Sequence, residues 1–261
     1  RLAVDFVLVE GLLASFYKEF DQRTFKSANL NSALQVLQSK KATYLDVNKY
    51  SVEVGEILAD VLGANVTAEL LPDGRMYFNI ANRVINETLQ KNYDLITGYA
   101  SDVQTQLNHS ANIHMRAQVP DLNQDRVDGI VNRVSSEPEF DKIKWLLNEP
   151  IVTFSQSVVD DVLQSNVEFQ AKSGLRPKIT RRVVGKACKW CSSLAGSYDY
   201  FDKPEEIYQR HERCRCTVEY DPGSGRRQDV WSKKWVDPQR ETKIEARKQL
   251  NIKKKTPAPS A

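Results

Sequence analysis

The stretch ANRVINETLQKNYDLITGYASDVQTQL, residues 81–107, has the clearest periodicity of the chain. Its apolar side chains recur at steps of three and four residues, or multiples of these, at Ala81, Val84, Ile85, Leu89, Ile96, Tyr99, Val103 and Leu107. This spacing places them on one face of an α-helix of about 30 residues, which Gly98 weakens locally. A helix of that length usually packs in a bundle or projects from one. Residues 1–171 are therefore expected to be mainly helical.

Further helices are expected on both sides of this stretch. They cover about residues 3–20, 48–62, 124–136 and 139–147. The segment LPDG at 71–74 predicts a turn, and 111–123 lacks periodicity and predicts a loop. Pro150 suits the first turn of one more helix. The buried face of that helix is marked by Ile151, Phe154, Val158, Val162 and Phe169.

The pattern changes after KSGLRP, residues 172–177, where a glycine and a proline are typical of a domain boundary. Strands are expected over 178–185, 193–201 and 214–220. Residues 202–211 predict a helix with Asp202 as its N-cap. The predicted fold class is therefore α+β, with a long helix in its mainly helical part.

All four cysteines lie in ACKWCSSLAGSYDYFDKPEEIYQRHERCRC, residues 187–216. Cys188 and Cys191 form a C-x-x-C pair, and His211, Cys214 and Cys216 close the stretch as H-x-x-C-x-C. In thiolate-rich zinc sites a C-x-x-C turn provides two ligands, and a second pair beyond a loop completes the tetrahedron. One ion needs four ligands, so the spacing leaves open which of the five stays outside the coordination shell. His211, if it is the one, would orient a ligand by a hydrogen bond.

A structural Zn²⁺ would clip short strands together in a segment that has too little core of its own. The predicted organisation is a helical domain over 1–175, a small β-rich, zinc-stabilised domain over 176–240, and a basic C-terminal helix or tail over 241–261.

Three other readings of the cysteine stretch stay open at this point. A redox dithiol normally opens a helix within a βαβ unit, a pattern that does not surround Cys188. A disulfide staple needs an oxidising compartment. A catalytic zinc would keep an open position with a base nearby, for which Glu212 is the candidate, but the stretch holds enough ligands to close the shell.

The charge of the chain is unevenly distributed. Residues 1–171 carry 15 Lys and Arg against 23 Asp and Glu, a net charge of −8, whereas 172–261 carry 22 against 11, a net charge of +11. This split indicates an acidic partner for the C-terminal third, with nucleic acid the first candidate, although a basic tail can also serve solubility alone. The residues expected to contact DNA without reading its sequence are Lys233, Lys234, Arg240, Lys243, Arg247, Lys248, Lys253, Lys254 and Lys255.

No membrane partner is expected. The longest nearly apolar run, residues 6–16, is about half of the roughly 20 residues that span a bilayer, and Glu10 interrupts it.

The segments RRVVGKACKWCSSLAGSYDY and RHERCRCTVEY together resemble the C-terminal region of tailed-bacteriophage minor head proteins, the Mu F-like head morphogenesis family. The matching positions are Cys188, Trp190, Cys191, Gly196, Tyr198, His211, Cys214 and Cys216. The specific match covers about residues 178–240, and the helical part fits only in general character.

This resemblance implies a minor capsid protein of the virion, made in the host cytoplasm and located inside the head near the portal vertex. Its implied roles are head assembly, DNA packaging or DNA delivery. Its implied partners are the portal protein, the major capsid protein and packaged double-stranded DNA. The family implies no firm catalytic activity, so the chain is not expected to be an enzyme.

Two other classes of protein remain open as alternatives. A zinc-supported nuclease or toxin module needs a histidine base and a hydrolytic metal, and His211 is the one histidine of the region. A cellular zinc-containing protein that binds nucleic acid shares the charge argument but not the extended motif. His109 and His114 are expected to be ordinary surface residues, and Asp160 and Asp161 a solvated helix face.

Overall fold

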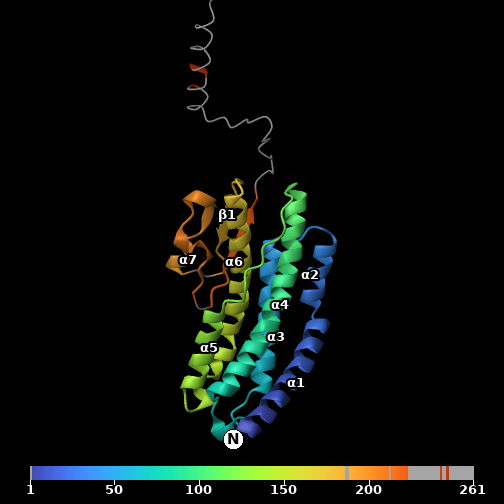
Figure 1. The fold of residues 1–261 in the computed structure, drawn as a ribbon, viewed down its shortest axis with the longest axis vertical. Coiled ribbons are helices and arrows are strands. Elements are labelled where there is room, and N and C mark those ends of the chain that lie inside the picture. The colour runs from blue at the N-terminus through green and yellow to red at the C-terminus, as the bar shows by residue number, and fades with distance from the viewer. Residues whose placement is uncertain (1, 186–187, 212, 223–241, 243–244, 247–261) are drawn as a thin grey trace, which may run out of the picture. The chain divides into compact units, whose positions relative to one another are not determined.

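The computed structural model describes residues 2–185, 188–211, 213–222, 242 and 245–246 (Figure 1). The chain divides into two compact units, Arg1–Gly223 and Ser224–Ala261, and the first holds all the helices and strands named below. Of the tail predicted over 241–261, only Thr242, Glu245 and Ala246 are described, and they are helical. Within the described residues, no helix is both long enough and apolar enough to cross a bilayer.

Six long helices make up most of the described chain. They are α1 (Leu2–Lys26), α2 (Ala28–Gln38), α3 (Tyr44–Asn65), α4 (Phe78–Ser110), α5 (Gln124–Ser136) and α6 (Glu149–Lys172). Figure 1 shows α1, α3, α4 and α6 running alongside one another. The helix α4 packs against α1, α3, α5 and α6, and α3 packs against α1, α2, α4 and α6, so these two helices lie at the centre of the bundle.

The periodicity of residues 81–107 is confirmed by α4, which has 33 residues and buries the predicted face except for Leu107, which is half-buried. The expected helix 124–136 coincides with α5, and Pro150 lies in the first turn of α6. The side chain of Ser27 caps α2, a helix for which the sequence analysis made no prediction. The expected turn at 71–74 is a single 3₁₀ turn, Pro72–Gly74.

The helix expected over 139–147 is wrong. The segment forms two 3₁₀ turns, Phe140–Lys142 and Lys144–Leu147, joined at Ile143. Its backbone bonds join residues three apart, such as Ile143 N to Phe140 O (2.9 Å), rather than four. Two short turns still bury Phe140, Ile143 and Leu147, which explains why the apolar pattern resembled that of a helix.

Phe169 is not on the buried face of α6. Its side chain is 40% exposed, because the last turns of α6 bury Asn166, Val167 and Gln170 instead. Gln170 Nε2 donates to Asn108 Oδ1 of α4 (2.9 Å), which fixes the side of α6 that faces inward.

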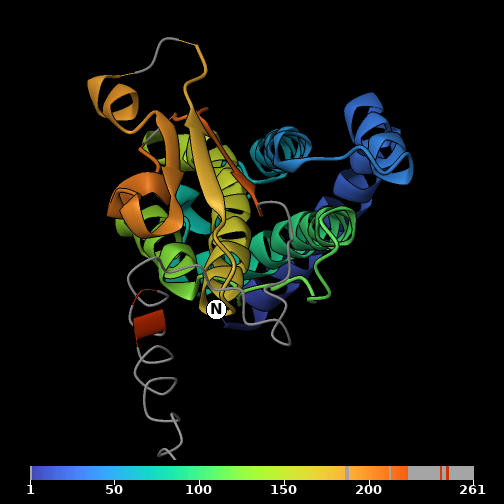
Figure 2. The same cartoon turned by 90° about the horizontal axis from the view of Figure 1, so that it is seen from above.

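The described strands form a small antiparallel sheet in the order β2-β1-β3. They are β1 (Lys178–Arg182), β2 (Gly196–Asp199) and β3 (Thr217–Asp221). The first two lie within the expected strand segments, and β3 extends one residue beyond the expected segment 214–220. A short helix, α7 (Lys189–Ser193), lies between β1 and β2. Seen from above in Figure 2, the sheet lies beside α6; β3 contacts both α6 and α3.

The helix expected over 202–211 is wrong. Residues Tyr200–Asp202 and Glu205–Tyr208 form 3₁₀ turns, and Asp202 ends the first turn rather than capping a helix. The bonds of the second turn, Ile207 N to Pro204 O and Gln209 N to Glu206 O, span three residues. The chain is then extended at Gln209, which directs Arg210 and His211 toward their partners.

The sheet shares one hydrophobic core with the helices. Ile179, Val218 and Tyr220 belong to the same cluster of buried side chains as the helices. Tyr220 Oη accepts hydrogen bonds from Gln104 of α4 and from Gln170 of α6 (3.2 Å). Polar bonds and apolar packing therefore join β3 to the bundle, while the expected boundaries near 175 and 240 stay predictions.

Candidate metal centre

The sheet brings the two halves of the cysteine stretch together. The end of β1 pairs with the starts of both neighbours, Arg181 opposite Gly196 and Arg182 opposite Thr217. The helix α7, which carries Cys191, precedes β2, and Cys216 directly precedes β3. Both pairs of cysteines therefore lie at the same end of the sheet, although 22 residues separate Cys191 from Cys214 in sequence.

The C-x-x-C turn is held by its own backbone. Cys188 is the N-cap of α7, and its Sγ accepts a hydrogen bond from Cys191 N (3.3 Å). This arrangement leaves the Cys188 thiol exposed at the rim and places the Cys191 thiol in the interior. The two sulfurs therefore approach the site from its outer and inner sides.

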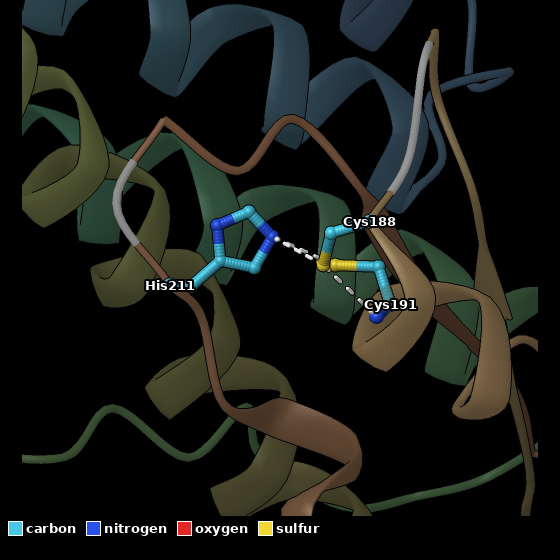
Figure 3. A group of neighbouring side chains, drawn as sticks. All are labelled: Cys188, Cys191 and His211. Atoms are coloured by element: carbon cyan, nitrogen blue, oxygen red, sulfur yellow. Dashed lines mark hydrogen bonds between the residues drawn. The ribbon is translucent and has the colours of Figure 1, made fainter.

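The five expected ligands form two groups that share Cys191: one holds Cys188, Cys191 and His211, and the other Cys191, Cys214 and Cys216. Figure 3 shows the His211 ring directed at the first two sulfurs: Nε2 lies 3.3 Å from Cys188 Sγ and 3.0 Å from Cys191 Sγ. Cys191 Sγ lies 3.7 Å from Cys214 Sγ, and the sulfurs of Cys191, Cys214 and Cys216 lie within 4.8 Å of one another. Sulfur ligands of a tetrahedral ion with Zn–S bonds of about 2.3 Å are about 3.8 Å apart, so the spacing of Cys191 Sγ and Cys214 Sγ matches such a site.

The four cysteines are free thiols in the structure, and the pKa values of Cys188, Cys191 and Cys214 are shifted in different directions. The N–H of Cys191 lowers the pKa of the exposed Cys188 thiol. Burial would raise the pKa of Cys214, but the Cys216 N–H and the charge of Arg210 outweigh it and hold that pKa below its ordinary value. Burial and the neighbouring thiols of Cys216 and Cys214 raise the pKa of Cys191 to about 12. A metal cation among the sulfurs would reverse that last effect, because its charge favours thiolates.

A buried arginine faces the sulfurs. Arg181 is 2% exposed, and its Nη2 lies 3.9 Å from both Cys191 Sγ and Cys214 Sγ. Its Nη1 donates to Ile207 O (2.6 Å), and its guanidinium lies 5.5 Å from the centre of the Trp190 ring. Sequence reasoning missed this residue, although a signal existed: in β1 the side chains of Ile179 and Arg181 lie on the same face by the two-residue period of a strand.

A second buried arginine joins the site to the helical bundle. Arg210 forms a bidentate ion pair with Asp160 of α6, and both side chains are almost fully buried. Its Nη1 donates to Cys216 O (2.7 Å). Gln156 of α6 completes the contact when its amide is turned so that its nitrogen donates to Cys214 O (2.8 Å) and its oxygen accepts from Arg210 Nη1 (3.3 Å).

The expectation that Asp160 and Asp161 form a solvated face is therefore wrong for Asp160. Burial raises the pKa of Asp160, against the opposing charge of Arg210. The two carboxylates do diverge, as expected, because Asp161 pairs with Arg126 at the surface (2.6 Å). The partner of Asp160 lies 50 residues away in sequence, so its burial could not be inferred from α6 alone.

The other candidates are not brought to this cluster. His109 and His114 are exposed. Glu212 and the nine Lys and Arg residues expected to contact DNA lie outside the described residues. Chemically, the described cluster offers four thiols, one imidazole and a neighbouring buried guanidinium, which is a set for holding a soft or borderline divalent cation.

No protein-family model matches this chain, and neither a curated protein nor a solved structure does.

Proposed function

We propose that the cluster holds a structural zinc ion. The observation that carries this proposal is the convergence of the two ends of a 29-residue stretch, with His211 Nε2 3.0 Å and Cys214 Sγ 3.7 Å from Cys191 Sγ. Thiolate and imidazole ligands in tetrahedral spacing select zinc over harder cations. Protein ligands suffice to close the shell, so the ion's role is to clip α7 to the start of β3 rather than to activate a substrate.

For the whole protein, we propose a structural role in a tailed-bacteriophage head, near the portal vertex, in head assembly, DNA packaging or DNA delivery. The support is the likeness of residues 178–240 to the Mu F-like head morphogenesis family. The positions that carry the likeness have physical roles in this fold. The Trp190 ring packs edge-on against His211 at 5.9 Å, and Tyr198 pairs opposite Ile179 in the sheet.

The experiment that tests the head role is mass spectrometry of purified phage particles, together with co-purification of the chain with the portal protein. The chain is expected in mature heads at a low copy number and in a complex with the portal. Its absence from purified particles would contradict the proposal.

We also propose non-specific contact with packaged DNA through the nine basic residues between Lys233 and Lys255. Each lost phosphate contact should reduce the slope of log affinity against log salt by about 0.9. Replacement of Lys253, Lys254 and Lys255 by Gln is expected to reduce this slope, whereas the same change at Lys18, Lys26 and Lys40 in the acidic part serves as the control. Equal effects of the two triple variants would contradict the assignment.

A cleavage assay distinguishes the structural role from the alternative that the protein is a nuclease. The full-length protein is incubated with DNA and added divalent metal, and the products are separated by size. We expect intact DNA. Cleavage that disappears in His211→Ala would replace the structural role by a nuclease.

A further inference from the structure

Arg181 is a buried cation that makes no direct ion pair with a carboxylate of the described residues. Within this part of the chain, the polar contacts of its guanidinium are Ile207 O and the sulfurs of Cys191 and Cys214. An uncompensated buried charge is strongly unfavourable. Asp160 is the ion-pair partner of Arg210, the other buried arginine at the site, and its charge also acts on Arg181. One carboxylate therefore faces two buried cations, and the negative charge that balances the remaining positive charge must come from the thiolates.

This balance limits how many thiolates bind the ion. A divalent cation with two thiolates is neutral and leaves Arg181 uncompensated. With four thiolates the ion and Arg181 together keep one negative charge in the interior. With three thiolates and a neutral imidazole, the complex carries one negative charge and Arg181 cancels it. Charge neutrality in a buried site thus favours three cysteines and one histidine.

The contacts indicate which cysteine is left out. Cys188 and Cys191 both contact His211 Nε2, which leaves Cys214 or Cys216 as the fourth ligand, since both sulfurs lie within 4.8 Å of Cys191 Sγ. Cys214 is the better placed, because its Sγ lies 3.7 Å from Cys191 Sγ, close to the roughly 3.8 Å between two sulfur ligands of one ion. Arg181 Nη2 lies equally close to the sulfurs of Cys191 and Cys214. The backbone of Cys216 supports this set, because its N–H donates to the Cys214 sulfur and its carbonyl accepts from Arg210.

We propose that Cys188, Cys191, His211 and Cys214 are the four ligands, that Cys216 is a buried thiol outside the coordination shell, and that Arg181 is the positioning residue that sets this choice. The inference rests on the zinc site proposed above and specifies it. Arg181 acts by neutralising the complex and by donating to two of its sulfurs, which fixes their orientation and favours their ionised form.

X-ray absorption spectroscopy of the full-length protein purified with zinc tests the ligand set. Because Zn–S bonds are about 2.3 Å and Zn–N bonds about 2.0–2.1 Å long, three sulfurs and one nitrogen are distinguishable from four sulfurs. We expect the mixed shell in the wild type and an unchanged shell, with one zinc per chain, in Cys216→Ser. The matched variant Cys214→Ser is expected to lose stoichiometric zinc. A four-sulfur shell, or loss of zinc from Cys216→Ser, would overturn the assignment.

Competition with a chromophoric chelator tests Arg181. Arg181→Met is expected to lower zinc affinity by about 10–100-fold, the usual cost of losing a partner that orients metal ligands. Arg181→Lys keeps the charge and is expected to recover part of the affinity. Arg182→Met is the control, because Arg182 is the next residue of β1, is exposed, and pairs with Glu219 at the surface. Equal affinities of Arg181→Met and the wild type would overturn the role.

Thermal unfolding in excess chelator separates this role from simple packing. Without the metal, Arg181 no longer faces a negatively charged complex, so Arg181→Met removes a poorly compensated buried charge and should unfold at or above the wild-type temperature. If Arg181 only filled space, its replacement by Met would lower the unfolding temperature both with and without zinc. A wild-type protein that binds no zinc at all would refute the proposed metal site itself, whereas a zinc protein with four sulfur ligands would refute only the ligand assignment.

Discussion

At the scale of single residues, the ion pair between Arg210 and Asp160 connects the cysteine stretch to the helical bundle. One guanidinium contacts the carboxylate of α6 and the backbone of Cys216. It also reaches Asn48 Oδ1 of α3 (3.3 Å). Three segments that are far apart in sequence thus meet at one buried cation, which is satisfied only while all of them are in place.

Asp160→Asn is expected to destabilise the protein by about 3–5 kcal/mol, because it leaves the Arg210 charge buried without a counter-ion. Asp161→Asn is the matched control. Its partner Arg126 is partly exposed, and such surface pairs contribute about 1 kcal/mol or less. Urea unfolding of both variants measures the difference. Equal decreases in the free energy of unfolding would contradict a larger contribution of the buried pair than of the surface pair.

At the scale of elements, the bundle depends on a close approach of α3 and α6. A Cβ added at Gly55 of α3 would lie 2.6 Å from Ser155 Oγ and 3.0 Å from Val152 Cα of α6. Ser155 Oγ also accepts from Asn92 Nδ2 of α4 (3.0 Å), so three helices meet at this point. Gly55 is therefore needed for its lack of a side chain rather than for any helical preference.

Gly55→Ala is expected to destabilise the fold by about 1–3 kcal/mol, because the added methyl group pushes the helices apart. Gly98→Ala is the control: Gly98 lies within α4 with nothing within 4 Å of the added Cβ. That change should stabilise the protein by about 1 kcal/mol, the difference in helix propensity. Thermal unfolding of the two variants should give shifts of opposite sign, and shifts of the same sign would contradict the close approach.

At the scale of the whole molecule, two separate attachments hold the sheet on the bundle. The cysteine cluster and the Arg210–Asp160 pair lie at the start of β3. The bonds from Gln104 and Gln170 to Tyr220 lie near its end. Tyr44 of α3 joins the second attachment through Gln104 Oε1 (2.7 Å). Loss of one attachment therefore leaves the other in place.

Removal of the metal by a chelator is expected to loosen the first attachment only. Backbone amides of α7 and of residues 205–211 and 213–217 should exchange with solvent hydrogen about tenfold faster or more, which corresponds to ~1.4 kcal/mol of local stability. Amides of α3 and α4 should keep their protection, because their core does not depend on the cluster. Hydrogen exchange followed by mass spectrometry measures both. Uniform loss of protection, or none, would contradict the two-attachment arrangement.

Local periodicity explains which elements were predictable. The spacing of Val84, Ile85 and Leu89 predicted α4, and Pro150 marked the first turn of α6. The helix predictions for the segments around Ile143 and Ile207 were wrong, because a 3₁₀ turn and an α-helix bury nearly the same apolar positions over a few residues. Over short segments the sequence pattern alone does not separate them.

The sequence by itself determined five of the six long helices, α2 being the exception, as well as the three strands, the five candidate ligands and the charge split between the two parts of the chain. These depend on spacing between near neighbours, which the order of residues already contains. Only the tertiary structure decided that Arg181 and Asp160 are buried and that the sulfurs face a cation. Burial of a charge depends on which distant group balances it, and Asp160 and Arg210 are brought together only when the sheet packs on α6.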